Sequence, residues 1–84
     1  MTNDPSDLER IAWVRALCAA GAVAGIRLAA RVSMRELAGV VGVTAASVHR
    51  WESGTAQPTG ERALAYADAL ERLGARRRPV RSAS

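Results

Sequence analysis

The sequence contains no phenylalanine, no lysine and only one cysteine among its 84 residues. The single Cys18 cannot form an intrachain disulfide, which is typical of proteins of a reducing compartment such as the cytoplasm. His49 is the only histidine, so the usual ligands of a metal site are missing and no metal or cofactor is expected. The chain also has no glycine-rich phosphate loop and no plausible pair of carboxylates in a cleft. These absences exclude most classes of enzyme, and we expect no catalytic residues.

Long uninterrupted apolar runs are absent as well. The most apolar stretch, residues 11–30, contains Arg15 and Arg27 and falls short of a membrane span. The acidic N-terminus lacks the basic start and apolar run of a signal peptide. We therefore expect a soluble cytoplasmic protein without membrane contact. A chain of 84 residues is expected to form one domain, with a small core that buries ~60% of the surface of the unfolded chain.

Arginine supplies all 12 basic residues, and the net charge is +4. The positive charge is concentrated in residues 10–50 and 72–84, and arginine binds phosphate through two parallel hydrogen bonds. Two basic segments favour a polyanionic partner such as nucleic acid, with a merely solvated surface as the alternative. Residues with AT-rich codons are rare, which suggests a genome of high GC content, such as that of an actinobacterium or one of its phages.

The apolar residues, 49% of the chain, are mostly alanine, valine and leucine. Small aliphatic residues with few β-branched runs favour closely packed helices over strands, so we predict an all-α fold.

A first helix is predicted over residues 7–30, after a polar lead-in (1–6). Ser6 and Glu9 form a capping box at its start. Apolar or small residues then recur at spacings of three and four, which is typical of one helical face: Ile11, Val14, Cys18, Gly21, Gly25, Leu28 and Val32. Its two glycines either bend or interrupt the helix or let a neighbouring helix approach closely. Cys18 lies on this face, where packing is favoured over reactivity.

Three further helices are predicted over 34–41, 45–53 and 60–73. Their expected N-cap residues are Ser33, which forms a capping box with Glu36, then Thr44 and Thr59. Their expected ends are Gly42, Gly54 and Gly74. The chain thus divides into the lead-in (1–6), one domain (7–74) and a basic disordered tail (75–84). The charges of this tail are Arg76, Arg77, Arg78 and Arg81.

The two short helices around Gly42 have the pattern of a helix-turn-helix, in which two helices cross at a steep angle through a tight turn. Such a motif needs a small residue where the helices approach, a glycine in the left-handed turn and apolar residues toward the core. Ala38 and Gly42 occupy the first two positions. The apolar positions are Leu37, Val41, Val43, Val48 and Trp51.

The run SMRELAGVVGVTAASVHRWESGTAQPT resembles the Cro/repressor-type (XRE) helix-turn-helix family, most closely its small phage Cro-type regulators. The residues that carry the resemblance are Ser33, Glu36, Leu37, Ala38, Gly42, Val43, Thr44, Trp51, Glu52, Ser53, Gly54 and Pro58. The resemblance covers about residues 23–73. It implies a compact bundle of four to five helices of the lambda-repressor-like type.

The resemblance also implies a structural ion pair between Arg27, at the end of the family's first helix, and Glu52, after the recognition helix. Two independent surface charges are the alternative. The chain departs from the family in two respects, because residues 7–22 lengthen the first helix and no fifth helix follows Gly74. We expect residues 8–18 to pack on the last helix of the same chain, near Leu70 and Leu73, which leaves a monomer or weak homodimer.

In this family the second helix of the motif lies in the major groove of DNA. The residues expected at the DNA are Thr44, Ala45, Ala46, Ser47, His49 and Arg50. The two alanines offer only methyl contacts, so hydrogen-bonded recognition depends on Arg50, His49 and Ser47. Arg50 either contacts a guanine or binds a phosphate, and His49 either contacts a base or only faces solvent.

Phosphate contacts are expected from the amino end of the helix that begins at Ser33, from Arg35, and from Thr55 and Gln57 after the recognition helix. Arg31 is a weaker candidate. The sequence therefore predicts a sequence-specific regulator of transcription that binds a double-stranded DNA operator. The alternative is a protein-interaction module, such as an antitoxin or adaptor that docks a partner through the extended first helix. The exposed basic face of residues 44–50 favours DNA.

Overall fold

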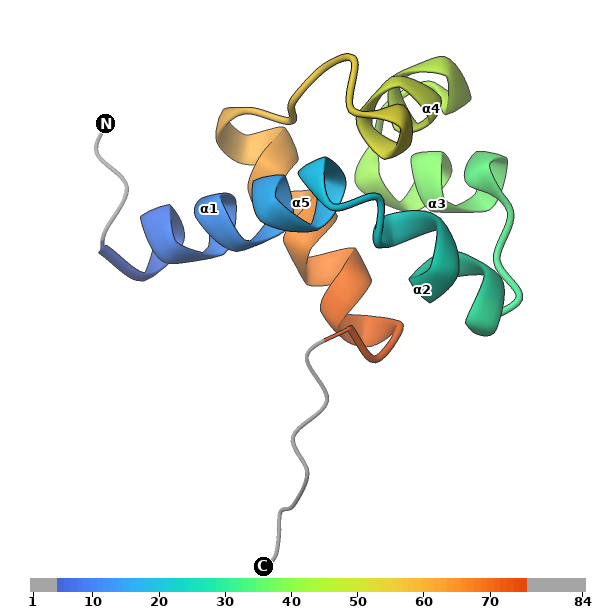
Figure 1. Ribbon diagram of the computed structural model, residues 1–84, viewed down its shortest axis with the longest axis horizontal. Coiled ribbons are helices and arrows are strands. Elements are labelled where there is room, and N and C mark those ends of the chain that lie inside the picture. The colour runs from blue at the N-terminus through green and yellow to red at the C-terminus, as the bar shows by residue number, and fades with distance from the viewer. Residues whose placement is uncertain (1–4, 76–84) are drawn as a thin grey trace, which may run out of the picture.

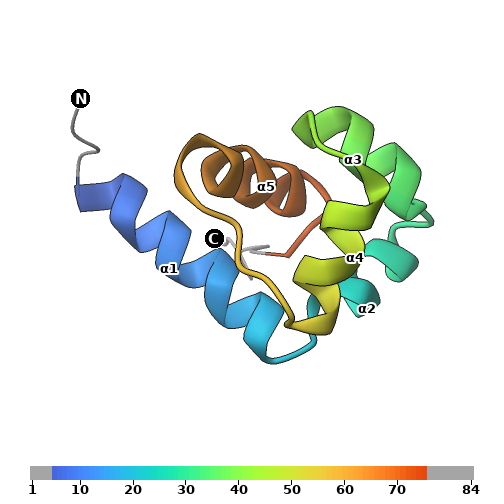
Figure 2. The same ribbon diagram turned by 90° about the horizontal axis from the view of Figure 1, so that it is seen from above.

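The computed structural model describes residues 5–75, which form five α-helices and no strand. The helices are α1 (Pro5–Ala19), α2 (Val23–Ala29), α3 (Met34–Val41), α4 (Ala45–Ser53) and α5 (Gly60–Arg72). They form an all-α bundle of the lambda-repressor-like type, as the family resemblance implies (Figure 1). Figure 2 shows α1 and α3 on opposite sides of α5, so α5 lies at the centre of the bundle.

Residues 7–30 do not form one continuous helix. The chain is interrupted at Gly21, which is one of the two alternatives that the sequence left open for its glycines. This residue has φ +70°, a left-handed value that glycine adopts without steric cost. The two helices on either side, α1 and α2, are bent relative to each other by 90°. The structure does not show the other role proposed for the glycines, the close approach of a neighbouring helix. An added Cβ at Gly21 or Gly25 would have no atom within 4 Å.

This bend has two consequences for the expected features of the first helix. Among residues 5–75 no single helix is long and apolar enough to cross a membrane, and α1 and α2 satisfy that test only as a bent pair. The predicted apolar face is also discontinuous, since Leu28, which belongs to it, is 63% exposed. The start of α1 differs too, because Pro5 is already helical and Ser6 lies inside the helix instead of capping it.

The core is formed where α1 packs on α5, as expected, and where α3 packs on the same helix. From α1, Val14 and Cys18 are buried, and from α5, Tyr66 and Leu70 are buried. The ring of Trp51 in α4 lies 4.7 Å from that of Tyr66 with a tilt of 43°, a favourable arrangement for two aromatic rings. Helix α1 therefore covers the core from within the same chain.

Two arginines of α1 add polar contacts that the sequence pattern did not reveal. Arg10 Nη2 donates a hydrogen bond to Glu71 Oε1 at 3.0 Å, which joins α1 to the end of α5. Arg15 Nε donates to the carbonyl oxygen of Pro58 at 3.1 Å, which joins α1 to the loop before α5. Both contacts link residues that lie more than 40 positions apart, so no local spacing could have predicted them.

Candidate functional site

The helix-turn-helix is formed by α3 and α4 around Gly42, which adopts the predicted left-handed conformation with φ +88°. The amides of Gly42 and Val43 both donate to the carbonyl oxygen of Ala38, at 2.8 and 3.0 Å. Ala38 itself is buried at the contact with the core, as the motif requires. The predicted apolar positions Leu37, Val41, Val48 and Trp51 are buried, and Val43 is half-buried against the core.

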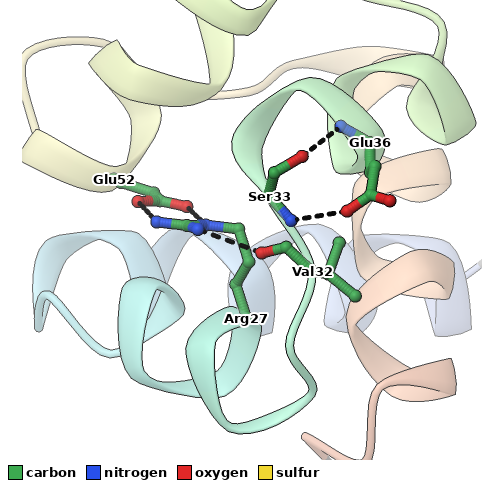
Figure 3. Close-up of polar contacts among 5 residues, drawn as sticks. All are labelled: Arg27, Val32, Ser33, Glu36 and Glu52. Atoms are coloured by element: carbon green, nitrogen blue, oxygen red, sulfur yellow. Dashed lines mark hydrogen bonds and ion pairs between the residues drawn. The ribbon is translucent and has the colours of Figure 1, made fainter.

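The amino ends of both helices are capped by the residues that the sequence indicates. Ser33 Oγ accepts from the Glu36 amide at 3.0 Å, and Glu36 Oε1 accepts from the Ser33 amide at 2.9 Å, so the capping box is complete (Figure 3). These hydrogen bonds lower the pKa of Glu36 below its usual value. At the start of α4, Thr44 Oγ1 accepts from the Ser47 amide at 3.1 Å. Thr59 is the N-cap residue of α5 but makes no such side-chain hydrogen bond.

A buried ion pair joins α2 to the last turn of α4. Arg27 Nε donates to Glu52 Oε2 at 2.7 Å and Arg27 Nη2 donates to Glu52 Oε1 at 3.1 Å (Figure 3). Only 9% and 6% of the two side chains are exposed. Arg27 Nη1 also donates to the carbonyl oxygen of Val32 at 3.0 Å, and the hydrogen bond to Glu52 raises the pKa of Arg27. The pair implied by the family resemblance is therefore present, and it fixes the loop before α3 to the end of α4.

The outer face of α4 carries the residues expected to contact bases. Thr44, Ala46, His49 and Arg50 are exposed, whereas Val48 and Trp51 point into the core. Two expected residues depart from this pattern, since Ala45 and Ser47 are only half-exposed and Ala45 packs against the core. The first turn of α4 is thus partly covered by the rest of the domain, and the side chains of Ala45 and Ser47 offer less surface to DNA than the sequence suggests.

The hydrogen bonds of this face show which of its groups remain available. Ser47 Oγ accepts from Thr44 Oγ1 at 3.2 Å and from Arg50 Nη2 at 3.3 Å. The guanidinium of Arg50 thus has one long hydrogen bond, to the hydroxyl of half-exposed Ser47, which is a weak restraint. Most of its donors are free to bind a base edge or a phosphate.

The residues expected to contact phosphates flank this face. Ser33 and Arg35 are exposed at the start of α3, and Thr55 and Gln57 are exposed after α4. The capping box uses the amides of Ser33 and Glu36, so a phosphate at this helix end would have to bind the amides between them. Thr55 Oγ1 donates to the carbonyl oxygen of Arg50 at 3.3 Å and extends the end of α4. The tail residues Arg76, Arg77, Arg78 and Arg81 lie outside the described residues.

The described residues also bear on metal binding and on the reactivity of Cys18. Within residues 5–75, no group of three or more His, Cys, Asp or Glu side chains could hold a metal ion. Cys18 is buried, and this burial raises the pKa of its thiol to about 11, so the reactive thiolate is disfavoured. Trp13 of α1 is half-buried and packs against the core.

The comparisons with known proteins bear on the same region of the chain. The family model described as Helix-turn-helix, of the XRE/Cro-like type, matches residues 24–73. The match begins in α2 and ends after α5, so α1 lies outside it. The chain matches no curated protein and no solved structure.

Proposed function

The chain belongs to the XRE/Cro-like helix-turn-helix family, and on that basis we propose that it is a cytoplasmic, sequence-specific regulator of transcription of the phage Cro type. The family is one of DNA-binding regulatory domains and not of enzymes, and a double-stranded DNA partner follows from it. Sequence-specific recognition of an operator is the step that we add to this assignment.

One observation carries the proposal, namely that the exposed face of α4 has no acidic side chain. The only acidic residue of α4 is Glu52, and its carboxylate is buried against Arg27. The face that remains presents His49 and Arg50 to solvent. A helix face with no carboxylate and a guanidinium whose donors are mostly available suits the negative potential of the major groove and its guanine acceptors.

In this proposal α4 lies in the major groove and α3 lies across the backbone. Arg50 contacts guanine O6 and N7 or a phosphate, and His49 and Ser47 make further base contacts. The start of α3, with Ser33 and Arg35, binds a phosphate on one side of the groove. Thr55 and Gln57 bind the opposite backbone. The methyl groups of Thr44 and Ala46 are available for thymine, and half-exposed Ala45 offers a smaller methyl contact.

We also propose that the protein is a monomer or a weak homodimer. The packing of α1 supports this, since Ile11, Val14 and Cys18 face the core of their own chain. Among the described side chains of α1, Leu8 is the only large apolar one that is exposed, so this helix leaves little apolar surface for the partner that an adaptor or antitoxin would dock.

The proposal is tested by footprinting on the DNA that flanks the gene of this protein, followed by binding titrations with the protected duplex and a scrambled duplex. We expect the protected site to bind about 10³-fold more tightly than scrambled DNA at physiological salt. Ala46→Glu places a carboxylate on the exposed face of α4 and should abolish binding.

Ala16→Glu is the matched control, because Ala16 is an exposed alanine of α1 outside the proposed interface. It should bind DNA as the unaltered protein does. Equal affinity for the two duplexes, or equal losses in the two variants, would show that α4 does not recognise an operator.

A further inference from the structure

A pocket of about 340 Å³ lies beside the helix-turn-helix, between α3 and the C-terminal half of α5. Its size is at the lower end of the ~300–1,000 Å³ of small-molecule sites, which are apolar cavities with a few polar groups. The apolar walls come from α3, from α5 with its C-cap residue, and from the residue after Arg31: Leu37, Val40, Ala69, Leu73 and Val32. Leu37 and Ala69 are buried, whereas Val40 is 72% exposed although it is apolar. None of these residues belongs to the outer face of α4.

The charged residues of the pocket are Arg31, Arg72 and Glu36. Two of the three already have partners, since Arg72 Nε lies 3.0 Å from Asp68 Oδ2 and Glu36 is part of the capping box. Within residues 5–75, the exposed side chain of Arg31 makes no ion pair or hydrogen bond. The pocket therefore combines an apolar interior with one uncommitted positive charge.

The position of Arg31 is fixed by its backbone. It has φ +62°, the only left-handed value among the non-glycine residues that the structure describes. Its amide donates to the carbonyl oxygen of Leu28 at 3.0 Å, and the next carbonyl, that of Val32, accepts from buried Arg27. A conformation that L-residues rarely adopt persists only when the surrounding structure determines it. The ion-pair network of Arg27 thus holds Arg31 at the pocket.

We propose that this pocket binds a small aliphatic monocarboxylate of medium chain length, with its tail against the apolar walls and its carboxylate at the guanidinium of Arg31. Arginine and carboxylate form paired, charge-assisted hydrogen bonds, and an alkyl chain gains from burial against leucine, valine and alanine. A ligand with one negative charge fits better than a dianion, because Glu36 adds a negative charge to the same pocket. The site is formed by α3, the end of α5 and the loop before α3, so its occupation does not require that α4 recognises DNA.

The direct test is a calorimetric titration of the full chain with octanoate, hexanoate, acetate and octan-1-ol. We expect one site for octanoate, and affinity that rises about fourfold for each added methylene that is buried. Octan-1-ol and acetate each lack one half of the proposed contact and should bind at least about tenfold more weakly than octanoate. In NMR spectra the amides of Leu37, Ala69 and Leu73 should shift on titration with octanoate.

Three variants locate the contact. Arg31→Asn removes the guanidinium but tolerates the left-handed conformation, and it should weaken octanoate binding about tenfold. Val40→Glu adds a negative charge at an exposed helical position of the pocket and should weaken octanoate binding more than Arg31→Asn does. Arg62→Gln removes the same charge as Arg31→Asn from an exposed site of α5 outside the pocket, so its affinity should be unchanged.

Equal binding of octan-1-ol and octanoate would overturn the assignment of a carboxylate. Equal losses in Arg31→Asn and Arg62→Gln, or amide shifts confined to other helices, would overturn the site.

Discussion

Two charged residues of α4, only two positions apart, have opposite environments. Glu52 is buried in a paired contact with Arg27, whereas Arg50 is exposed and has one long hydrogen bond to Ser47. Residues two apart on an α-helix point to nearly opposite sides, so one side of α4 is fixed to the protein and the other faces solvent. Arg27 and Arg50 are both arginines, but Arg27 is buried against Glu52 and has a structural role, whereas Arg50 is exposed and available for a ligand. Burial and partners, and not residue type, therefore separate the two roles.

The largest effect is expected on the buried side. Glu52→Ala leaves the guanidinium of Arg27 buried without its partner, which should lower the free energy of unfolding by about 3–5 kcal/mol in urea denaturation. The double variant Arg27→Met/Glu52→Leu removes both charges and should recover most of that loss. A loss below about 0.5 kcal/mol for Glu52→Ala, as for an ordinary surface residue, would contradict the structural role of the pair.

On the exposed side we expect a change in DNA binding and none in folding. Arg50→Ala should weaken binding to the operator by about 1–3 kcal/mol and relax the preference at one base pair. Its free energy of unfolding should stay within about 0.5 kcal/mol of the original value. Binding titrations with the operator and with random duplexes measure the first effect. Should affinity fall equally for both duplexes, Arg50 binds a phosphate and not a base.

A smaller effect is expected at Ser33, the N-cap residue of α3. Ser33→Ala removes the acceptor of the capping box and should lower the free energy of unfolding by about 1 kcal/mol. Thr59→Ala is the matched control and should cost less, because Thr59 caps α5 without a side-chain hydrogen bond. Since the pKa of Glu36 is lowered, its contribution is present near neutral pH and lost on acidification. Chemical denaturation of both variants at neutral and at acidic pH measures the free energies of unfolding. Equal losses in Ser33→Ala and Thr59→Ala would contradict this role of Ser33.

The smallest effect is expected at Cys18 of α1, whose thiol is buried in the core. Burial and, secondly, the charge of Glu52 raise the pKa of Cys18 from 9.0 to about 11, so the folded chain keeps the thiol neutral. The resulting stability is fully present below pH 9.0 and is lost as the pH rises to about 11. Alkylation by iodoacetamide at pH 8 should be slow in the native protein and fast in urea. The free energy of unfolding of Cys18→Ala should fall less steeply at high pH than that of the unaltered protein. Rapid alkylation of the native chain would show that the Cys18 thiol is accessible to water.

Much of the fold was predictable because its signals are local. Ser33 with Glu36, Thr44 with Ser47 and the left-handed Gly42 act through hydrogen bonds or backbone angles within four residues of each other. The boundaries of α3 and α4 and the helix-turn-helix itself follow from such signals. The ion pair of Arg27 and Glu52 was anticipated from the family resemblance and not from spacing, since 25 positions separate the two residues.

The break between α1 and α2 was not decided by local signals. The spacing of apolar residues continues through Gly21, which allows a helix to bend or stop but does not select either outcome. The packing of α1 on α5, and the contact of Arg27 with Glu52, require two directions for the two helices. The exposure of Leu28 follows from the same bend.

By itself, the sequence determined that the chain is helical, where α3 and α4 begin and end, and that Gly42 joins them as a helix-turn-helix. These features depend on contacts between near neighbours along the chain. The tertiary structure alone decided the direction of α1, the half-burial of Ala45 and Ser47, and the meeting of Arg31 with the apolar walls from α3 and α5. Each of these depends on which helix packs against which, and side chains far apart in sequence acquire their surroundings only when the core forms.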